Sequence, residues 1–531
     1  MPNPGTVSAQ GTESDAQPKP PKRILLRTTS SILSFLTQEA YTALTLLVAF
    51  VATPLILHWL GDERFGAFEA LTSWAAYLGV LELGISDALP PLFARAFGTG
   101  DREATRKLLA ASVWAYLKVA TAMMIVGVAV WPFITKLVPV SQSLASDLRC
   151  AWLVGLSVGP LLPFSAFMVL AQSEQRGYWV NSLLIGQSLM ITALSMLFAW
   201  ARWGITGQAL AVIPGTIAFN LVLGIRGFRE MPRLLRAILK EPIDDQAHRE
   251  ISRLRWPSLV LNFCGRLALL SNTVIIALLM SPATVVPFYI TLRLNTIAMR
   301  ELAAIAGSSW AALAELQAQR KFDLFNLRLI ELTRLVAILA VAGLVPIVAY
   351  NHFFVGLWVG RSRYGGGALT TISCVNAMLA SAFVLWSWCV TATGHVRDLT
   401  VAWIAQTAIN LSTSIIFTIK FGIVGPVLGT LVSYLAVHIW YYPYILRRLF
   451  DTQPKQLFKA VIAPLVIGVP YAAFALWFSS VFGAANWFTI IWQMVAMTLL
   501  YIGIAALALL SRSERALWIQ RVRLTLTRQP A

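Results

Sequence analysis

The sequence has few charged residues for its length. Asp, Glu, Lys and Arg make up only 12% of its 531 residues, while 57% are hydrophobic. A soluble domain carries about a quarter charged residues. This scarcity therefore excludes an ordinary water-soluble protein and indicates one that resides in a lipid bilayer.

Cysteine and histidine are scarce as well. The sequence has four Cys and five His, and the Cys residues lie in apolar segments with no shared close spacing. No His pairs with a Cys or another His at a ligand spacing, so the sequence predicts neither a metal site nor a disulfide framework. We expect no cofactor. The Cys residues are Cys150, Cys264, Cys374 and Cys389.

What the chain has in abundance is long apolar runs. A transmembrane helix needs about 20 apolar residues, and this criterion predicts about fourteen spans. They are 32–58, 65–93, 108–134, 148–171, 179–200, 204–226, 257–280, 285–313, 329–350, 367–391, 399–419, 422–446, 459–480 and 486–510. The predicted fold class is all-α, a polytopic membrane protein.

The basic residues are distributed unevenly between the two sides. Lys and Arg number 42 against 24 Asp and Glu, for a net charge of +18. Alternate loops carry most of them. The opposite loops carry only Arg64, Lys136, Arg149, Arg202, Arg361, Arg363 and Lys420. This bias follows the positive-inside rule, so it predicts cytoplasmic termini and argues against nucleic-acid binding.

One short sequence motif occurs twice in the chain. ARWGITGQALA (201–211) and IKFGIVGPVLG (419–429) share Gly-Ile-x-Gly-x-x-Leu, so that Gly204 corresponds to Gly422. Gln187 and Gln406 recur at nearly the same offset. Six spans separate the copies, which predicts two parallel six-helix lobes around a central cavity. Gly can adopt the positive φ that a tight link between helices requires.

This organisation predicts domain boundaries. We expect a disordered cytoplasmic tail (1–28), a first six-helix lobe (29–226) and a basic cytoplasmic linker (227–256). A second six-helix lobe (257–450), two additional transmembrane helices (451–510) and a basic cytoplasmic tail (511–531) follow. The first 21 residues hold no apolar run, so they do not resemble a cleaved secretory signal.

The stretch 60–101 resembles the second helix of bacterial polysaccharide-export flippases. The resemblance rests on Leu60-Gly61, Glu63, Phe65-Gly66, Glu82-Leu83-Gly84 and Ala94-Arg95, on FVGLWVGRSRYGGGALTTI (354–372) and on the two glycine turns. These flippases, which translocate O-antigen or exopolysaccharide repeat units, belong to the multidrug/oligosaccharidyl-lipid/polysaccharide exporter superfamily. That superfamily also holds multidrug antiporters and lipid II flippases.

The resemblance implies the cargo and the place of action. The cargo would be an oligosaccharide on undecaprenyl diphosphate or a similar polyprenyl diphosphate, flipped from the cytoplasmic to the outer leaflet by alternating access. The membrane would be the bacterial inner membrane, and the product would enter lipopolysaccharide or exopolysaccharide assembly. Implied partners are membrane lipids, a polysaccharide polymerase and glycosyltransferases.

Ionisable residues inside spans are costly and usually functional. In the second lobe these are arginines, whose guanidinium groups bind phosphate through paired hydrogen bonds. We select Arg266, Arg300 and Arg293 as diphosphate contacts, whereas Arg334 lies three residues after Glu331 and fits a local pair.

The first lobe is acidic by contrast. Glu69 lies in its second span, and Glu39, Glu82 and Asp87, together with Lys118, are candidates for ion coupling with H⁺ or Na⁺ or for a latch between the lobes. Both roles stay open.

Two other classes fit parts of the sequence. An ion-coupled multidrug or small-molecule antiporter fits the lobes, although a basic second lobe would repel a cationic cargo. A membrane-embedded glycan polymerase or glycosyltransferase fits Asp62-Glu63 in the first outer loop. Because the outer loops are short and carry no catalytic constellation, we expect a transporter and not an enzyme.

Overall fold

The computed structural model describes residues 22–82, 84–99, 101–231, 233–240, 260, 263–268, 270–510, 515 and 520. Within these ranges the chain forms helices and turns and no strand. The greater part of the predicted amino-terminal tail, of the 227–256 linker and of the carboxyl-terminal tail lies outside the described residues.

The first lobe comprises the helices before the linker. They are α1 (Lys22–Leu60), α2 (Asp62–Leu78), η1 (Gly79–Glu82), α3 (Ile85–Thr99), α4 (Arg102–Val130), η2 (Trp131–Phe133), α5 (Ile134–Leu137), η3 (Gln142–Leu144), α6 (Ala145–Leu156), η4 (Gly159–Phe164), α7 (Ser165–Ser173), α8 (Gly177–Trp200) and α9 (Gly204–Glu230). The short α10 (Leu234–Lys240) follows.

The second lobe begins with helical residues 263–268 and 270–279. It continues with α12 (Pro282–Thr291), α13 (Arg293–Ala318), α14 (Phe322–Trp358), η5 (Arg361–Arg363), α15 (Gly367–Ala392), α16 (Val396–Phe421), η6 (Gly422–Val424), α17 (Gly425–Ser433), the π-helical η7 (Tyr434–His438) and α18 (Ile439–Phe450). Helices α19 (Pro454–Phe482) and α20 (Trp487–Leu509) follow the second lobe and pack on α14.

The described helices cover most of the predicted spans, and part of the predicted span 257–280 lies outside the described residues. Ten helices are long and apolar enough to cross a membrane, and one of these, Val396–Phe450, is a hairpin in which α16 packs on α17. The predicted spans 65–93 and 285–313 correspond to the interrupted pairs α2–α3 and α12–α13. The prediction of an all-α, multi-pass membrane protein is confirmed, and about fourteen crossings fit the helices.

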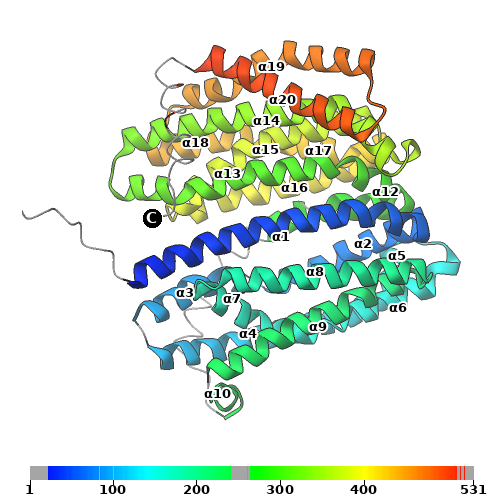
Figure 1. Ribbon diagram of the computed structural model, residues 1–531, viewed down its shortest axis with the longest axis vertical. Helices are drawn as coiled ribbons and strands as arrows, with labels where there is room; N and C mark the ends of the chain where they lie inside the picture. Colours follow the sequence, from blue (N-terminus) through cyan, green and yellow to red (C-terminus); the bar gives the residue numbers. More distant parts are fainter. Residues whose placement is uncertain are drawn as a thin grey trace, which may run out of the picture.

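The two lobes lie side by side with their helices nearly parallel (Figure 1). The start of α1 and the end of α20 lie at the same end of the molecule, which we call the near end. The opposite end, where α1 turns into α2 at Gly61, is the far end. Helix α1 runs between the rest of its lobe and the second lobe.

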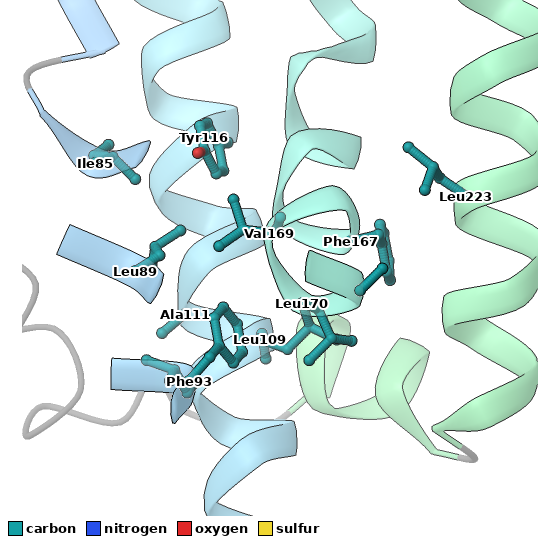
Figure 2. Packing of buried hydrophobic residues seen from close by; sticks show 14 of the residues in the cluster. Ile85, Leu89, Phe93, Leu109, Ala111, Tyr116, Phe167, Val169, Leu170 and Leu223 are labelled. Carbon is teal, nitrogen blue, oxygen red and sulfur yellow. The ribbon is translucent and has the colours of Figure 1, made fainter. Parts of the chain in front are cut away.

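The near half of the first lobe has its own apolar core. Figure 2 shows Ile85, Leu89 and Phe93 of α3 beside residues of α4 and α7, and each of these three is at most 1% exposed. Tyr116 of α4 is fully buried in the same cluster, and its hydroxyl lies 2.9 Å from the Ser86 hydroxyl. This core fixes α3 and the turn before it, which contains Glu82.

The duplicated turn has the same backbone feature in both lobes. Gly204 has φ of 63° and Gly422 has φ of 61°, as the sequence predicted for such links. The paired glutamines also act alike. Gln187 donates to the Thr216 hydroxyl (3.3 Å), and Gln406 donates to the Ser433 hydroxyl (3.1 Å), so each ties its helix to the next one.

The lobes pack against each other at the far end. Leu57 and Phe65 of the first lobe share an apolar cluster with Val286, Ile290 and residues at the end of α14. A Cβ on Gly66 would overlap the carbonyl oxygen of Pro282, so α2 and α12 meet backbone to backbone. The far end is therefore closed between the lobes in this structure.

Candidate functional site

Arg266 lies on the second lobe and contacts the first. Its Nη1 donates to the carbonyl oxygen of Ala76 (3.3 Å), and its Nη2 lies 3.9 Å from Oε2 of Glu82. The side chain remains 40% exposed. Gly79 makes this approach possible, because a Cβ there would overlap Nη1. The guanidinium is thus held at the lobe boundary with donors to spare.

Glu82 belongs to a short polar chain in the first lobe. Ser86 donates a hydrogen bond to Oε1 of Glu82, and the Ser86 and Tyr116 hydroxyls lie 2.9 Å apart. Glu82 therefore has a hydrogen-bond partner in its own lobe in addition to the looser contact with Arg266. Of the residues predicted from the sequence, the structure brings Arg266 and Glu82 together.

Arg293 occupies a second position at the boundary. Its Nη1 donates to the Tyr289 hydroxyl (3.3 Å), with the guanidinium carbon 5.9 Å from the ring centroid. Arg293 also interacts electrostatically with Glu69 of α2. Phe65 of α2 packs against the same Tyr289 ring, with centroids 6.0 Å apart.

Glu69 was noted in the sequence but not selected as a site residue. The spacing could have singled it out, because Asp62 and Glu69 are seven residues apart and share one face of α2. Both face cations of the second lobe. Asp62 bonds Arg363, with Nη2–Oδ1 of 2.8 Å, while Glu69 interacts with Arg293.

The other predicted residues whose side chains the structure describes lie outside this contact. Arg300 is exposed and pairs with the adjacent Glu301 at 2.9 Å. Glu39 and Lys118 are exposed, on α1 and α4 respectively. Asp87 lies in α3, but its side chain falls outside the described part of the structure.

A cavity of about 380 Å³ lies within the first lobe. Residues of α2, α4, α9 and the interrupted helix α6–η4–α7 line it, among them Leu78, Met123, Met124 and Trp152. The interruption is a six-residue 3₁₀ segment, η4, which contains Pro160 and Pro163. The sequence predicted a central cavity between the lobes and not this one, although Pro160 and Pro163 mark the interruption that lines it.

The sequence is similar to that of known membrane proteins. The MatE family model matches residues 40–175, in the first lobe. The uncharacterized membrane protein EpsK of Bacillus subtilis (strain 168) is 21% identical over 483 residues, covering 89% of this chain and 94% of EpsK.

Two solved structures share the architecture. Lipid II flippase MurJ in an inward closed conformation matches 90% of this chain and 99% of its own, with a TM-score of 0.67 and 13% identity. An inward-facing multidrug resistance MATE family transporter of the MOP superfamily matches 80% and 99%, with a TM-score of 0.63 and 16% identity.

The chain is therefore a multi-pass membrane protein with the fold shared by MurJ and the MATE transporters. The predicted resemblance to the superfamily that holds lipid II flippases and multidrug antiporters is confirmed. Both solved relatives are membrane transporters, one a flippase and the other a multidrug resistance protein.

Proposed function

We propose that the protein flips a polyprenyl-diphosphate-linked oligosaccharide from the cytoplasmic to the outer leaflet. The observation that carries the proposal is Arg266, a guanidinium at the lobe boundary with an exposed fraction of 40% and only a loose carboxylate partner. A diphosphate suits such a group, because the guanidinium can donate two hydrogen bonds to phosphate oxygens at once.

In the proposed working cycle, Arg266 exchanges one anionic partner for another. In this structure Arg266 is 3.9 Å from Glu82, a distance beyond a good hydrogen bond. An incoming diphosphate would displace Glu82, which keeps its hydrogen bond from Ser86. Loss of the Arg266–Glu82 attraction would then loosen one tie between the lobes as cargo arrives.

Arg293 extends the cationic surface of the second lobe toward the far end. It donates a hydrogen bond to the Tyr289 hydroxyl, and Glu69 acts on it as a nearby charge, so its remaining donors are available to a phosphate. Arg300 remains a weaker candidate, because Glu301 already neutralises it at 2.9 Å. We propose the order Arg266, Arg293, Arg300 for the contribution to diphosphate binding.

The proposal includes the location. We place the near end and both termini in the cytoplasm of a bacterium with the protein in its inner membrane, because basic residues concentrate on the near-end loops. The same proposal includes the domain boundaries predicted from the sequence and the polymerase and glycosyltransferase partners. It also includes coupling to H⁺ or Na⁺ through Glu39, Glu82, Asp87 or Lys118.

Lipid analysis tests the function directly. Lipid-linked oligosaccharides would be extracted from a strain lacking the protein and identified by mass spectrometry. We expect a complete repeat unit to accumulate, and wild-type protein but not Arg266→Ala to clear it. If no lipid-linked sugar changes, the flippase proposal is wrong.

The antiporter is the second candidate, since a MATE transporter has the same fold and Glu69 is a carboxylate at the lobe boundary. Export of a fluorescent cation in the same strain distinguishes the two. Cation export that requires Glu69, combined with unchanged lipid-linked sugars, would favour the antiporter.

A further inference from the structure

The cavity of the first lobe and Arg266 meet at one segment of α2. Ala75 and Leu78 line the cavity, whereas Ala76 and Gly79 are the residues that Arg266 touches. An apolar cavity and a cationic group thus lie on neighbouring faces of the same helical turn. This is the arrangement that a molecule with an anionic head and an apolar tail requires.

The cavity offers little to a polar ligand. Four of its polar residues already donate hydrogen bonds within the protein: Thr72 to the carbonyl of Glu69 (2.9 Å), Thr216 to that of Val212 (2.8 Å), Asn220 to that of Thr216 (2.8 Å) and Trp152 to that of Gly127 (2.8 Å). The remaining lining is mostly Leu, Val, Phe, Ala and Met. Methionine side chains adapt to irregular apolar shapes.

In the described part of the second lobe, aromatic side chains occupy the corresponding position. The offset between Gly204 and Gly422 relates Thr216 and Asn220 to Tyr434 and His438. These two side chains pack into an aromatic cluster, with Tyr434 and His438 centroids 5.5 and 5.4 Å from that of Phe383. The two lobes therefore differ at these positions, with small polar side chains in the first lobe and packed aromatic rings in the second.

The cavity is also open. Thr72 and Ala75 of α2 and Gly155 of α6 are lining residues that remain exposed. Its volume of about 380 Å³ lies at the lower end of the range for ligand pockets, which is about 300–1,000 Å³. Such a space holds part of a chain and leaves the remainder in the surrounding lipid.

We infer that the first-lobe cavity binds the diphosphate-proximal part of the polyprenyl chain while Arg266 holds the diphosphate. The inference rests on the proposed function and adds the site for the tail. It assigns the tail to the first lobe and the charged head to the second, so that one cargo molecule contacts both lobes.

Gly155 provides a direct test. It lines the cavity, and a Cβ on it would meet no atom within 4 Å, so a Phe can enter the space without a clash at its first carbon. Gly186 of α8 is the matched control, because it is exposed, has no atom within 4 Å of a Cβ and does not line the cavity.

The probe is farnesyl diphosphate carrying a photoreactive diazirine on its chain. The full-length protein would be held in nanodiscs of phosphatidylethanolamine and phosphatidylglycerol, and cross-links would be mapped by mass spectrometry. We expect cross-links at Met123 and Met124, and Gly155→Phe should weaken half-maximal labelling at least about tenfold. Excluding even two methylene groups from an apolar site costs about that factor. Gly186→Phe should leave the labelling unchanged.

The outcomes separate the two proposals. If inorganic diphosphate competes with the probe in wild type but not in Arg266→Gln, the head site is supported independently of the tail. If the probe labels wild type and Gly155→Phe equally, the cavity inference is wrong and the flippase proposal survives. If a diazirine phospholipid labels Met123 and Met124 as well as the probe does, the cavity takes acyl chains and the assignment to cargo is wrong. If the probe labels nothing specifically, both proposals are wrong.

Discussion

Gly204 and Gly422 have nearly the same positive φ at corresponding points of the two lobes, 63° and 61°. Each follows a long helix, α8 or α16, and turns the chain back into the next helix. Their surroundings differ. A Cβ on Gly204 would overlap Oδ2 of Asp147, whereas one on Gly422 would reach no closer than 3.5 Å to the Met280 methyl carbon.

We predict that alanine at either glycine lowers stability for different reasons. At Gly422, φ of 61° and ψ of −135° are accessible almost only to glycine, at a cost of about 1–3 kcal/mol for other residues. At Gly204 the clash with Asp147 adds to the positive φ. Because Asp147→Ala removes the clashing carboxylate, the double mutant Gly204→Ala/Asp147→Ala should lose less stability than the sum of the two single mutants. Thermal unfolding should show a difference of roughly 1 kcal/mol.

The same measurement on Gly422→Ala with Asp147→Ala is the control, and those two effects should add. Asp147 itself accepts hydrogen bonds from the Ile205 and Thr206 amides at 2.8 and 2.9 Å, so its loss alone should destabilise the protein. Additivity at both glycines would contradict the structure around Gly204.

We predict that Gly66→Ala opens the far end. A methyl group there would overlap the Pro282 carbonyl oxygen, a backbone atom that cannot rotate away, so α2 and α12 must separate. Overpacking of this kind costs about 1–3 kcal/mol. The variant should expose a cysteine placed at the fully buried Val286 to a water-soluble maleimide, in a Cys150→Ser background.

Gly186→Ala is the control for this experiment, since its Cβ would meet nothing within 4 Å. It should leave the maleimide rate unchanged. An unchanged rate in Gly66→Ala would mean that α2 and α12 do not form the closure described here.

We predict that Asp62→Asn also opens the far end, but less than Gly66→Ala does. Nη2 and Nε of Arg363 lie 2.8 and 2.9 Å from Oδ1 of Asp62, joining the loop before α15 to the start of α2. Partly exposed pairs contribute about 0.2–1 kcal/mol, so maleimide labelling at Val286→Cys should rise by roughly two- to fivefold. High salt should reduce the difference.

Exchanging the two charges, Asp62→Arg with Arg363→Asp, should restore part of the closure. Glu103→Gln removes an ion pair within a single helix, with Arg106, and should not alter labelling. Equal labelling rates in Asp62→Asn and wild type would show that apolar contacts alone close the far end.

We predict opposite effects at Arg266 and Glu82 on binding of inorganic diphosphate. Arg266→Gln should abolish binding, and Arg266→Lys should retain part of it, because an ammonium keeps the charge but loses the paired donors. Glu82→Gln should tighten binding about three- to tenfold, since it removes a competing carboxylate 3.9 Å away. Isothermal titration of the detergent-solubilised protein measures both.

Arg300→Gln is the matched control, because it removes one arginine that is already paired with Glu301. It should weaken binding less than Arg266→Gln does. A larger loss at Arg300 than at Arg266 would move the head site along α13 and away from the lobe boundary.

Local patterns in the sequence determined much of the fold. The low charge content and the apolar runs required a bilayer, and the length of each run required a helix, because the backbone must satisfy its own hydrogen bonds in lipid. The repeated Gly-Ile-x-Gly turn predicted both the lobe repeat and the positive φ at Gly204 and Gly422, since only glycine adopts such a turn without strain.

The tertiary structure decided which of these residues meet. From the sequence we favoured Arg266 and Arg300 on their depth within spans and placed Arg293 after them. In the structure, Gly79 allows Arg266 to lie against α2, while Arg300 pairs with Glu301. Likewise, the contact of Asp62 with Arg363 and the first-lobe cavity depend on how separate helices face one another. Hydrophobicity fixes whether a segment crosses the membrane, whereas side-chain packing between segments fixes where two of them touch.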